Sequence, residues 1–124
     1  MPDVVPKGWG REIIFASTEQ YAGKILEFSA AGSAMSLHFH RVKDETWYVL
    51  RGDFELTILH LQDASEHRRQ LLPGDAWRNE PFVPHRLRCL TREGGAILEV
   101  STRDDPADNH RIAPGDSQRS APGG

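Results

Sequence analysis

The stretch that decides the fold is Gly32–Gly52, GSAMSLHFHRVKDETWYVLRG. Its apolar residues recur with a period of two on both sides of a short charged connection, Arg41–Asp44, which is typical of two strands joined by a turn. His38 and His40 lie two residues apart on the first strand, so both side chains leave the same face, about 7 Å apart at the backbone. Glu45 begins the second strand, and we expect it to return a carboxylate to the same place.

The period of two continues through most of the chain, and turn-forming residues separate the apolar runs. No segment has a convincing helical period with caps, and Asp63–Glu66 is typical of a turn. Eight or more short antiparallel strands in one small domain favour an all-β sandwich, barrel or jelly roll. The strands that the pattern predicts are Glu12–Ser17, Lys24–Ala30, Met35–His40, Glu45–Leu50, Phe54–Leu61, His67–Leu72, His85–Cys89 and Ala96–Ser101.

Length and composition limit the function classes. The chain has 124 residues, which suits one domain, and its net charge of −3 comes without the basic cluster that a nucleic-acid partner requires. The single cysteine, Cys89, excludes an internal disulfide, and no apolar run suits a signal peptide or a membrane span. We therefore expect a cytoplasmic domain over residues 1–112, with neither nucleic acid nor membrane as partner. Residues 113–124, APGDSQRSAPGG, are expected to form a disordered tail because this composition cannot bury a core.

A third histidine completes a candidate metal site. His85 follows a Pro-Gly-Asp turn and the stiff segment Pro81–Pro84, again at the start of a predicted strand. With His38, His40 and Glu45 it offers three imidazoles and one carboxylate, a set that suits Mn, Fe, Co, Ni or Zn as a divalent ion with positions left open. A His-x-His pair by itself is more often part of a polar strand face, so the joint pattern carries the prediction.

The joint pattern resembles the two motifs of the cupin superfamily. Five residues separate Gly32 from His38, four separate His40 from Glu45, and six separate Glu45 from Gly52, all as in the first cupin motif. The second motif is represented by Pro73–Arg86, PGDAWRNEPFVPHR, in which the proline is displaced to Pro81 and Phe82 replaces a glycine. The resemblance implies a cupin-type jelly-roll barrel of short antiparallel strands, a metal held inside by the three histidines and the glutamate, and a homodimer.

A narrower resemblance, over about Lys7 to Ser101, is to the cupin domain of type II mannose-6-phosphate isomerases and their small stand-alone relatives. It rests on five short pieces, and two features depart from it. His38 replaces the usual glutamine ligand, and the C-terminal segment Asp108-Asn109-His110-Arg111 matches the acidic, arginine-containing segment of those isomerases only weakly. The matching pieces are Gly8-Trp9-Gly10, Met35-Ser36-Leu37, Glu45-Thr46-Trp47, His85-Arg86 and Leu98-Glu99-Val100.

This resemblance implies a metal-dependent isomerase acting on a small polar substrate, a sugar or sugar phosphate. Glu99, between two apolar residues of a predicted inner strand, is the candidate base, with a structural salt bridge as the alternative. Lys24 is in phase with buried positions and is the second catalytic candidate, although an edge-strand lysine fits equally well. Arg111 is a candidate for binding an anionic substrate, and the alternative is that its side chain is simply solvated. Two other functions remain open: an iron-dependent dioxygenase and a non-catalytic cupin that binds a small molecule.

Overall fold

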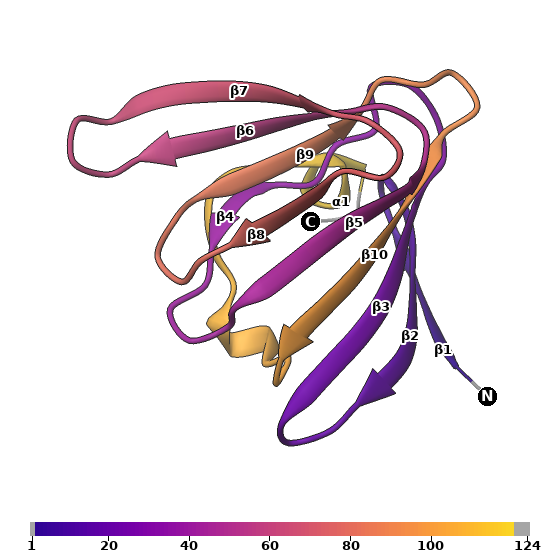
Figure 1. Cartoon of the computed structure of the whole chain (residues 1–124), viewed down its shortest axis with the longest axis horizontal. Helices are drawn as coiled ribbons and strands as arrows, with labels where there is room; N and C mark the ends of the chain where they lie inside the picture. The colour runs from indigo at the N-terminus through magenta and orange to yellow at the C-terminus, as the bar shows by residue number, and fades with distance from the viewer. Residues whose placement is uncertain (1, 121–124) are drawn as a thin grey trace.

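The computed structural model describes residues 2–120 and consists of two antiparallel sheets that face each other (Figure 1). The first sheet has six strands in the order β1-β2-β3-β10-β5-β8, and the second has five in the order β11-β4-β9-β6-β7. The strands of the first sheet are β1 (Asp3–Lys7), β2 (Gly10–Ser17), β3 (Tyr21–Phe28), β10 (Gly95–Thr102), β5 (Glu45–Arg51) and β8 (Ala76–Asn79). Those of the second are β11 (His110–Ala113), β4 (Leu37–Phe39), β9 (His85–Cys89), β6 (Phe54–His60) and β7 (Ser65–Leu71).

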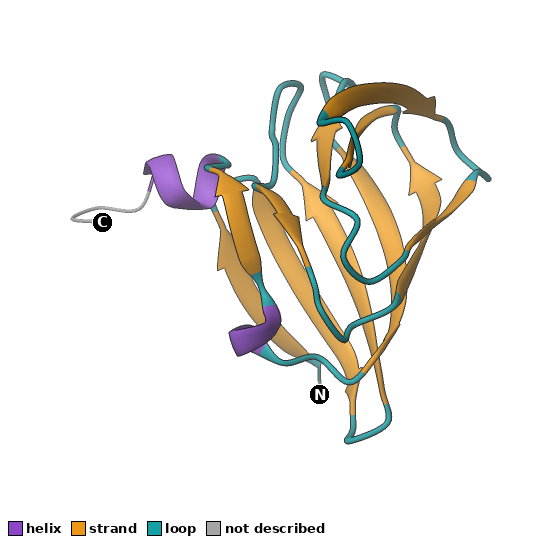
Figure 2. Ribbon diagram, turned by 90° about the vertical axis from the view of Figure 1, so that its left-hand side faces the viewer, coloured by secondary structure: helices purple, strands orange, loops and turns teal. Residues whose placement is uncertain are grey.

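The all-β jelly-roll expectation is confirmed, but over the described residues the two sheets do not close into a barrel. Two short helices, η1 (Pro106–Asp108) and α1 (Asp116–Ser120), lie at one edge of the molecule (Figure 2). The β6–β7 hairpin projects beyond the rest of the second sheet (Figure 1). Within the described part of the chain, none of the helices has the length and apolar character needed to cross a membrane.

The core lies between the sheets and is built from the inward residues of the alternating strands. Phe28 stacks on Trp9 with ring centroids 4.6 Å apart and meets Phe54 edge-on at 5.1 Å. Trp47 is 1 % exposed and its ring lies 5.4 Å from that of His85, so it joins the core to the predicted metal ligands. The remaining members of this core are Leu26, Met35, Val49, Leu56, Leu71, Leu87, Cys89 and Ile97.

Turn glycines hold the strand connections, as the sequence predicted. Gly52 has a φ of 81° and Gly94 a φ of 85°, a left-handed conformation that costs glycine little. The two turns also touch, because a Cβ on Gly52 would meet the carbonyl oxygen of Gly94 at 2.8 Å. These positions therefore require glycine for both conformation and space.

Several elements differ from the sequence-based expectation. The strands β1, β8 and β11 were not predicted, β3 begins at Tyr21 rather than Lys24, and β7 begins at Ser65, inside the expected turn. β4 is limited to Leu37–Phe39, and an isolated bridge pairs Ala34 with Arg88 outside it. The strands were missed because they are short or carry polar and proline residues, which weakens the period of two.

The segment expected to be a disordered tail from Ala113 has structure through residue 120, while residues 121–124 lie outside the described residues. β11 ends at Ala113, and α1 follows. Gly115 packs so closely on the main chain of Met35 that no side chain would fit, and the Asp116 carboxylate accepts a hydrogen bond from the Ala34 amide at 2.9 Å. Backbone contact rather than apolar burial holds this segment, so composition gave no sign of it.

Candidate metal centre and its cavity

The four predicted metal ligands meet at one point between the sheets. His38 lies on β4 opposite His85, the first residue of β9, while Glu45 is the first residue of β5 and His40 directly follows β4. One potential ligand atom from each of the four residues lies within 4.8 Å of the other three, and all four residues are buried. The four residues that the sequence predicted as ligands therefore lie together in a cluster that could hold a metal ion.

Main-chain carbonyls orient all three imidazoles. Nδ1 of His38 lies 2.7 Å from the carbonyl oxygen of Ser36, and Nδ1 of His85 lies 3.0 Å from that of Val83. Nδ1 of His40 lies 2.7 Å from the carbonyl oxygen of residue 108. A carbonyl oxygen only accepts, so each Nδ1 carries a proton, and in the neutral ring Nε2 is the nitrogen that keeps its lone pair. This fixed tautomer is the one that a metal site built on Nε2 atoms requires.

Two buried polar atoms in the cluster fit a bound cation. Glu45 Oε1 lies 3.0 Å from His85 Nε2 and 3.4 Å from His40 Nε2. Among the described residues, neither Glu45 Oε1 nor His85 Nε2 has a hydrogen-bond partner. Buried acceptors without a donor are costly, and a divalent ion between them would satisfy both. The donor set of three imidazoles and one carboxylate therefore fits a first-row divalent metal.

The protonation states also suit a metal. Burial, reinforced by the neighbouring His85, lowers the pKa of His38 to about 3, so this ring is neutral near neutral pH. Burial favours the neutral acid at Glu45, but contacts with Glu99, His40 and His85 outweigh it and hold the pKa of Glu45 well below its usual range. A neutral imidazole and an ionised carboxylate are the forms that bind metal ions.

A second group of charges lies beside the ligands, and it includes the predicted base. The Glu99 carboxylate on β10 accepts hydrogen bonds from Trp47 Nε1 at 3.0 Å and from Lys43 Nζ at 3.2 Å. Lys43 Nζ lies 3.7 Å from Glu45 Oε2 as well, so it contacts both carboxylates. Burial and the negative charge of Glu45 raise the pKa of Glu99, against the opposing effect of the lysines.

Lys24, the other predicted catalytic residue, points inward from β3. Its Nζ lies 2.7 Å from Asp104 Oδ2 and 3.5 Å from Glu12 Oε1, and its side chain is 7 % exposed. Its pKa is raised, because neighbouring carboxylates, Glu99 first, outweigh the effect of burial. Lys24 is therefore an inward-facing cation and not a solvated edge lysine.

One cavity of about 470 Å³ joins these groups. Its walls include three of the four candidate ligands, His38, His40 and Glu45, together with Glu99 and Lys24. Arg111 of β11 also lines this cavity, although the residue as a whole is exposed. The cavity walls thus carry ligands, a carboxyl group of raised pKa and at least two cations.

Sequence reasoning missed three residues of the site: Lys43, Asp104 and Asp108. Lys43 belongs to Arg41–Asp44, the charged connection between two predicted strands, yet it is only 5 % exposed. Asp104 contacts both buried lysines, and Asp108 contacts the loop that follows His40. The one available signal was the run Arg103-Asp104-Asp105, in which acidic residues directly follow a buried strand.

The loop before His85 keeps its shape without the glycine of the cupin motif. Phe82 takes its place with a φ of 69°, a left-handed conformation that is unusual for an aromatic residue. The Phe82 amide donates to the His40 carbonyl at 2.6 Å, and its ring stacks on Phe39 at 6.5 Å. The loop therefore remains attached to the strand that carries two of the ligands.

Comparisons with solved structures agree with this architecture. KdgF from Halomonas sp. is 21 % identical with a TM-score of 0.70, and the match covers 85 % of this chain and 89 % of that one. CapF of Staphylococcus aureus, a capsular polysaccharide assembling protein, is 14 % identical with a TM-score of 0.76, over 91 % of this chain and 33 % of its own. Oxalate decarboxylase of Bacillus subtilis, which has Mn(II) centres, is 18 % identical with a TM-score of 0.76, over 90 % and 30 %. This chain thus spans about a third of the latter two proteins.

The family assignment rests on the sequence itself. No curated protein matches the chain. A family model described as the cupin domain matches residues 25–101, which run from the middle of β3 to near the end of β10 and include all four candidate ligands. The chain therefore belongs to the cupin family, within its Cupin_2 group.

Proposed function

We propose that this cupin is a divalent-metal-dependent enzyme that moves a proton between adjacent carbons of a small polar, sugar-derived substrate, as an aldose–ketose isomerase does. The observation that carries the proposal is Glu99, a carboxyl group of raised pKa that lines the same cavity as three of the candidate metal ligands. The raised pKa makes the ionised form of Glu99 a stronger base than an ordinary carboxylate, and this ionised form is the one that would take a proton from carbon.

The candidate ligands set where the substrate would bind. His38, His40, Glu45 and His85 would hold the ion, and a divalent ion supplies Lewis acidity that polarises a carbonyl or hydroxyl oxygen. The cavity of about 470 Å³ lies within the size range of sites for small molecules. Its ionic lining favours hydroxyl, carboxylate or phosphate groups over apolar ones.

The residues around Glu99 orient its carboxyl group and supply positive charge near the cavity. Trp47 and Lys43 fix its two carboxylate oxygens, so the group is oriented as well as buried. In the proposed reaction Glu99 removes a proton from one substrate carbon and returns it to the next. Lys24, held by Asp104 at 2.7 Å, supplies positive charge near the cavity and is the candidate for steadying a substrate oxygen.

The test combines metal analysis with an assay of proton transfer. Tag-free protein is loaded with Mn, Co or Zn and incubated in D₂O with mannose 6-phosphate and free pentoses, and ¹H NMR detects isomer formation and loss of the exchanged carbon-bound proton. We expect turnover in the wild type, loss in Glu99→Gln with metal content retained, and no effect of the same substitution at the exposed residue Glu93. Oxygen uptake with any substrate would favour a dioxygenase instead. Metal binding without turnover across the panel would favour a non-catalytic binding cupin.

A further inference from the structure

Asp108 makes an unusual set of contacts at the end of η1. Its carboxylate accepts hydrogen bonds from three consecutive backbone amides, those of Arg41 at 2.7 Å on Oδ1 and of Val42 and Lys43 at 3.0 Å each on Oδ2. Its main-chain carbonyl accepts the hydrogen bond from Nδ1 of His40 at 2.7 Å. One residue therefore binds four consecutive residues of the β4–β5 connection.

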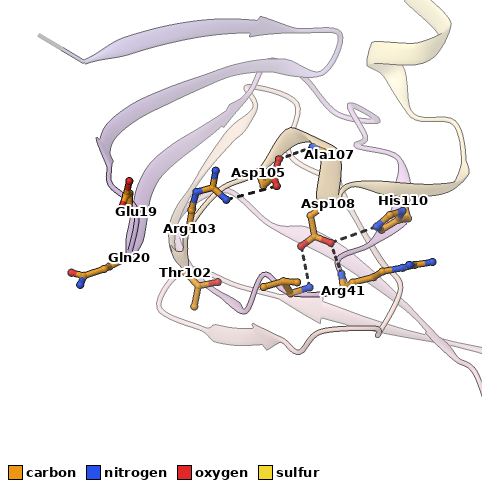
Figure 3. A pocket seen from close by; sticks show the side chains of 10 residues that line it. Glu19, Gln20, Arg41, Thr102, Arg103, Asp105, Ala107, Asp108 and His110 are labelled. Carbon is orange, nitrogen blue, oxygen red and sulfur yellow. Dashed lines mark hydrogen bonds and ion pairs between the residues drawn. The ribbon is translucent and has the colours of Figure 1, made fainter.

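The two halves of Asp108 contact different parts of the molecule. The side chain lines an open cleft of about 630 Å³ between the β2–β3 turn, the β4–β5 connection and residues 102–110 (Figure 3). His110 Nε2 also lies 3.5 Å from Oδ1. The carbonyl, in contrast, contacts a candidate metal ligand. The carboxylate thus attaches η1 to the β4–β5 loop, while the carbonyl orients the imidazole of His40.

The loop that Asp108 binds carries two groups of the site. His40 lies at its start, and at its end Lys43 extends Nζ to Glu99 Oε2 at 3.2 Å and Asp104 Oδ1 at 3.1 Å. Without the carboxylate, three backbone amides would lose their acceptor, and the loop would be free to turn the His40 ring and withdraw the ammonium group of Lys43. Other hydrogen bonds hold the two ends of the loop, where the His40 carbonyl accepts from the Phe82 amide and the Asp44 carbonyl accepts from the Thr102 amide. Val42, between these ends, has a side chain that is 76 % exposed.

We propose that Asp108 is a positioning residue that holds His40 in the metal-binding tautomer and orientation and places Lys43 against Glu99. This inference rests on the proposed function, since it treats His40 as a metal ligand. It assigns a role to a segment beyond residues 25–101, the stretch that matches the family. Asp108 touches neither substrate nor metal and acts through the residues it holds.

The first measurement is metal affinity, and Asp105 supplies a matched control. Asp105 is an acidic residue at the other end of η1 whose carboxylate caps that helix by accepting from the Ala107 amide at 3.0 Å. Titration with Co²⁺, followed by its visible absorption, should show binding at least about tenfold weaker in Asp108→Ala, the size typical for the loss of an outer-sphere partner. Asp105→Ala should remain within about twofold of the wild type. Equal losses in both variants would overturn the proposal, because general loosening of η1 would then explain them.

The second measurement uses the metal-free protein, so that it does not depend on the proposed function. Long-range ¹H–¹⁵N correlation spectra report which nitrogen of His40 carries the proton. We expect Nδ1–H in the wild type and in Asp105→Ala, and a mixture of tautomers in Asp108→Ala. If Asp108→Ala does not fold, Asp108→Asn takes its place, because an amide keeps the volume but puts a donor against at least one backbone N–H. Wild-type affinity and an unchanged His40 tautomer in a folded Asp108 variant would overturn the proposal. A wild type that binds no metal would overturn the proposed function alone.

Discussion

Replacing Glu45 with Gln should lower the stability of the protein, and added metal should widen the difference. In the metal-free wild type, the surroundings hold the pKa of Glu45 well below its usual range, so the folded state favours the ionised carboxylate over a neutral group. An amide at position 45 keeps the volume but loses the charge that faces Lys43 Nζ at 3.7 Å. Loss of a charged partner is worth about 1.5–3 kcal/mol, partly offset by an amide N–H placed against the buried His85 Nε2, which lies 3.0 Å from Glu45 Oε1. We expect the variant in EDTA to be less stable by about 1 kcal/mol, or about 4 °C in Tm for a chain of this size.

Metal should widen the advantage of the wild type. At a metal concentration 100 times its Kd, the wild type gains about 2.7 kcal/mol, whereas a variant with about 100-fold weaker affinity gains about 0.4 kcal/mol. Wild type should then lead by about 3.3 kcal/mol. Thermal unfolding followed by circular dichroism, in EDTA and in excess Mn²⁺ or Co²⁺, measures both differences, and Glu93→Gln at an exposed position serves as the control. A Glu45→Gln protein that is as stable as wild type in EDTA, or that gains equally from metal, would refute this account of the site.

Three further predictions concern pH, the second-motif loop and assembly. The pKa of Glu99 is raised to about 8 in the folded protein, so the folded state binds more protons than the unfolded state. The stability of the metal-free protein should therefore fall as the pH rises from 6.5 to 8. In Glu99→Gln, the free energy of unfolding measured in urea should change less over this pH range. His38, with a pKa of about 3, is neutral in the folded state and costs stability only as pH drops below 6.5, outside that window. Phe82→Gly should be more stable than Phe82→Ala by about 1 kcal/mol in chemical unfolding, because both lose the ring and only Gly accepts the positive φ without strain; equal stabilities would argue against a strained backbone. We also propose a homodimer through the outer face of the six-stranded sheet, where Tyr48 and Val100 are 46 % and 53 % exposed. Light scattering should give twice the chain mass of 13.9 kDa, and the double variant Tyr48→Lys/Val100→Lys should be monomeric. A monomeric wild type would count against this proposal.

The cluster of candidate ligands could be predicted from the sequence because the positions of its residues follow from local rules. His38 and His40 share a face through the period of two, and Glu45 and His85 each begin a predicted strand. The same alternation placed Glu99 on the inner face of β10, where it is 4 % exposed. Residues on regular strands are thus predictable in burial from their neighbours alone.

The residues that were missed depend on contacts between distant segments. Lys43 can be buried because its ammonium group contacts the carboxylates of Glu45, Glu99 and Asp104. The two that lie nearest to it, those of Glu99 and Asp104, are more than 50 residues away in the sequence. No local pattern distinguishes such a lysine from a solvated one. Gly115 is a similar case, since its role depends on a backbone contact with Met35 and not on its own neighbours.

The orientation of the three imidazoles by main-chain oxygens has a consequence for how this protein can vary. A substitution at Ser36 or Val83 changes a side chain but leaves the peptide oxygen in place, so it does not delete the group that sets the ring tautomer of His38 or His85. Only a change that moves the backbone can do so, and Asp108 is such a position because its side chain also holds the loop that follows His40. The centre is therefore shielded from most point mutations outside its four ligands. The cavity walls are side chains and have no such protection, so they are the natural positions to randomise in a library that seeks new substrates on an unchanged metal site.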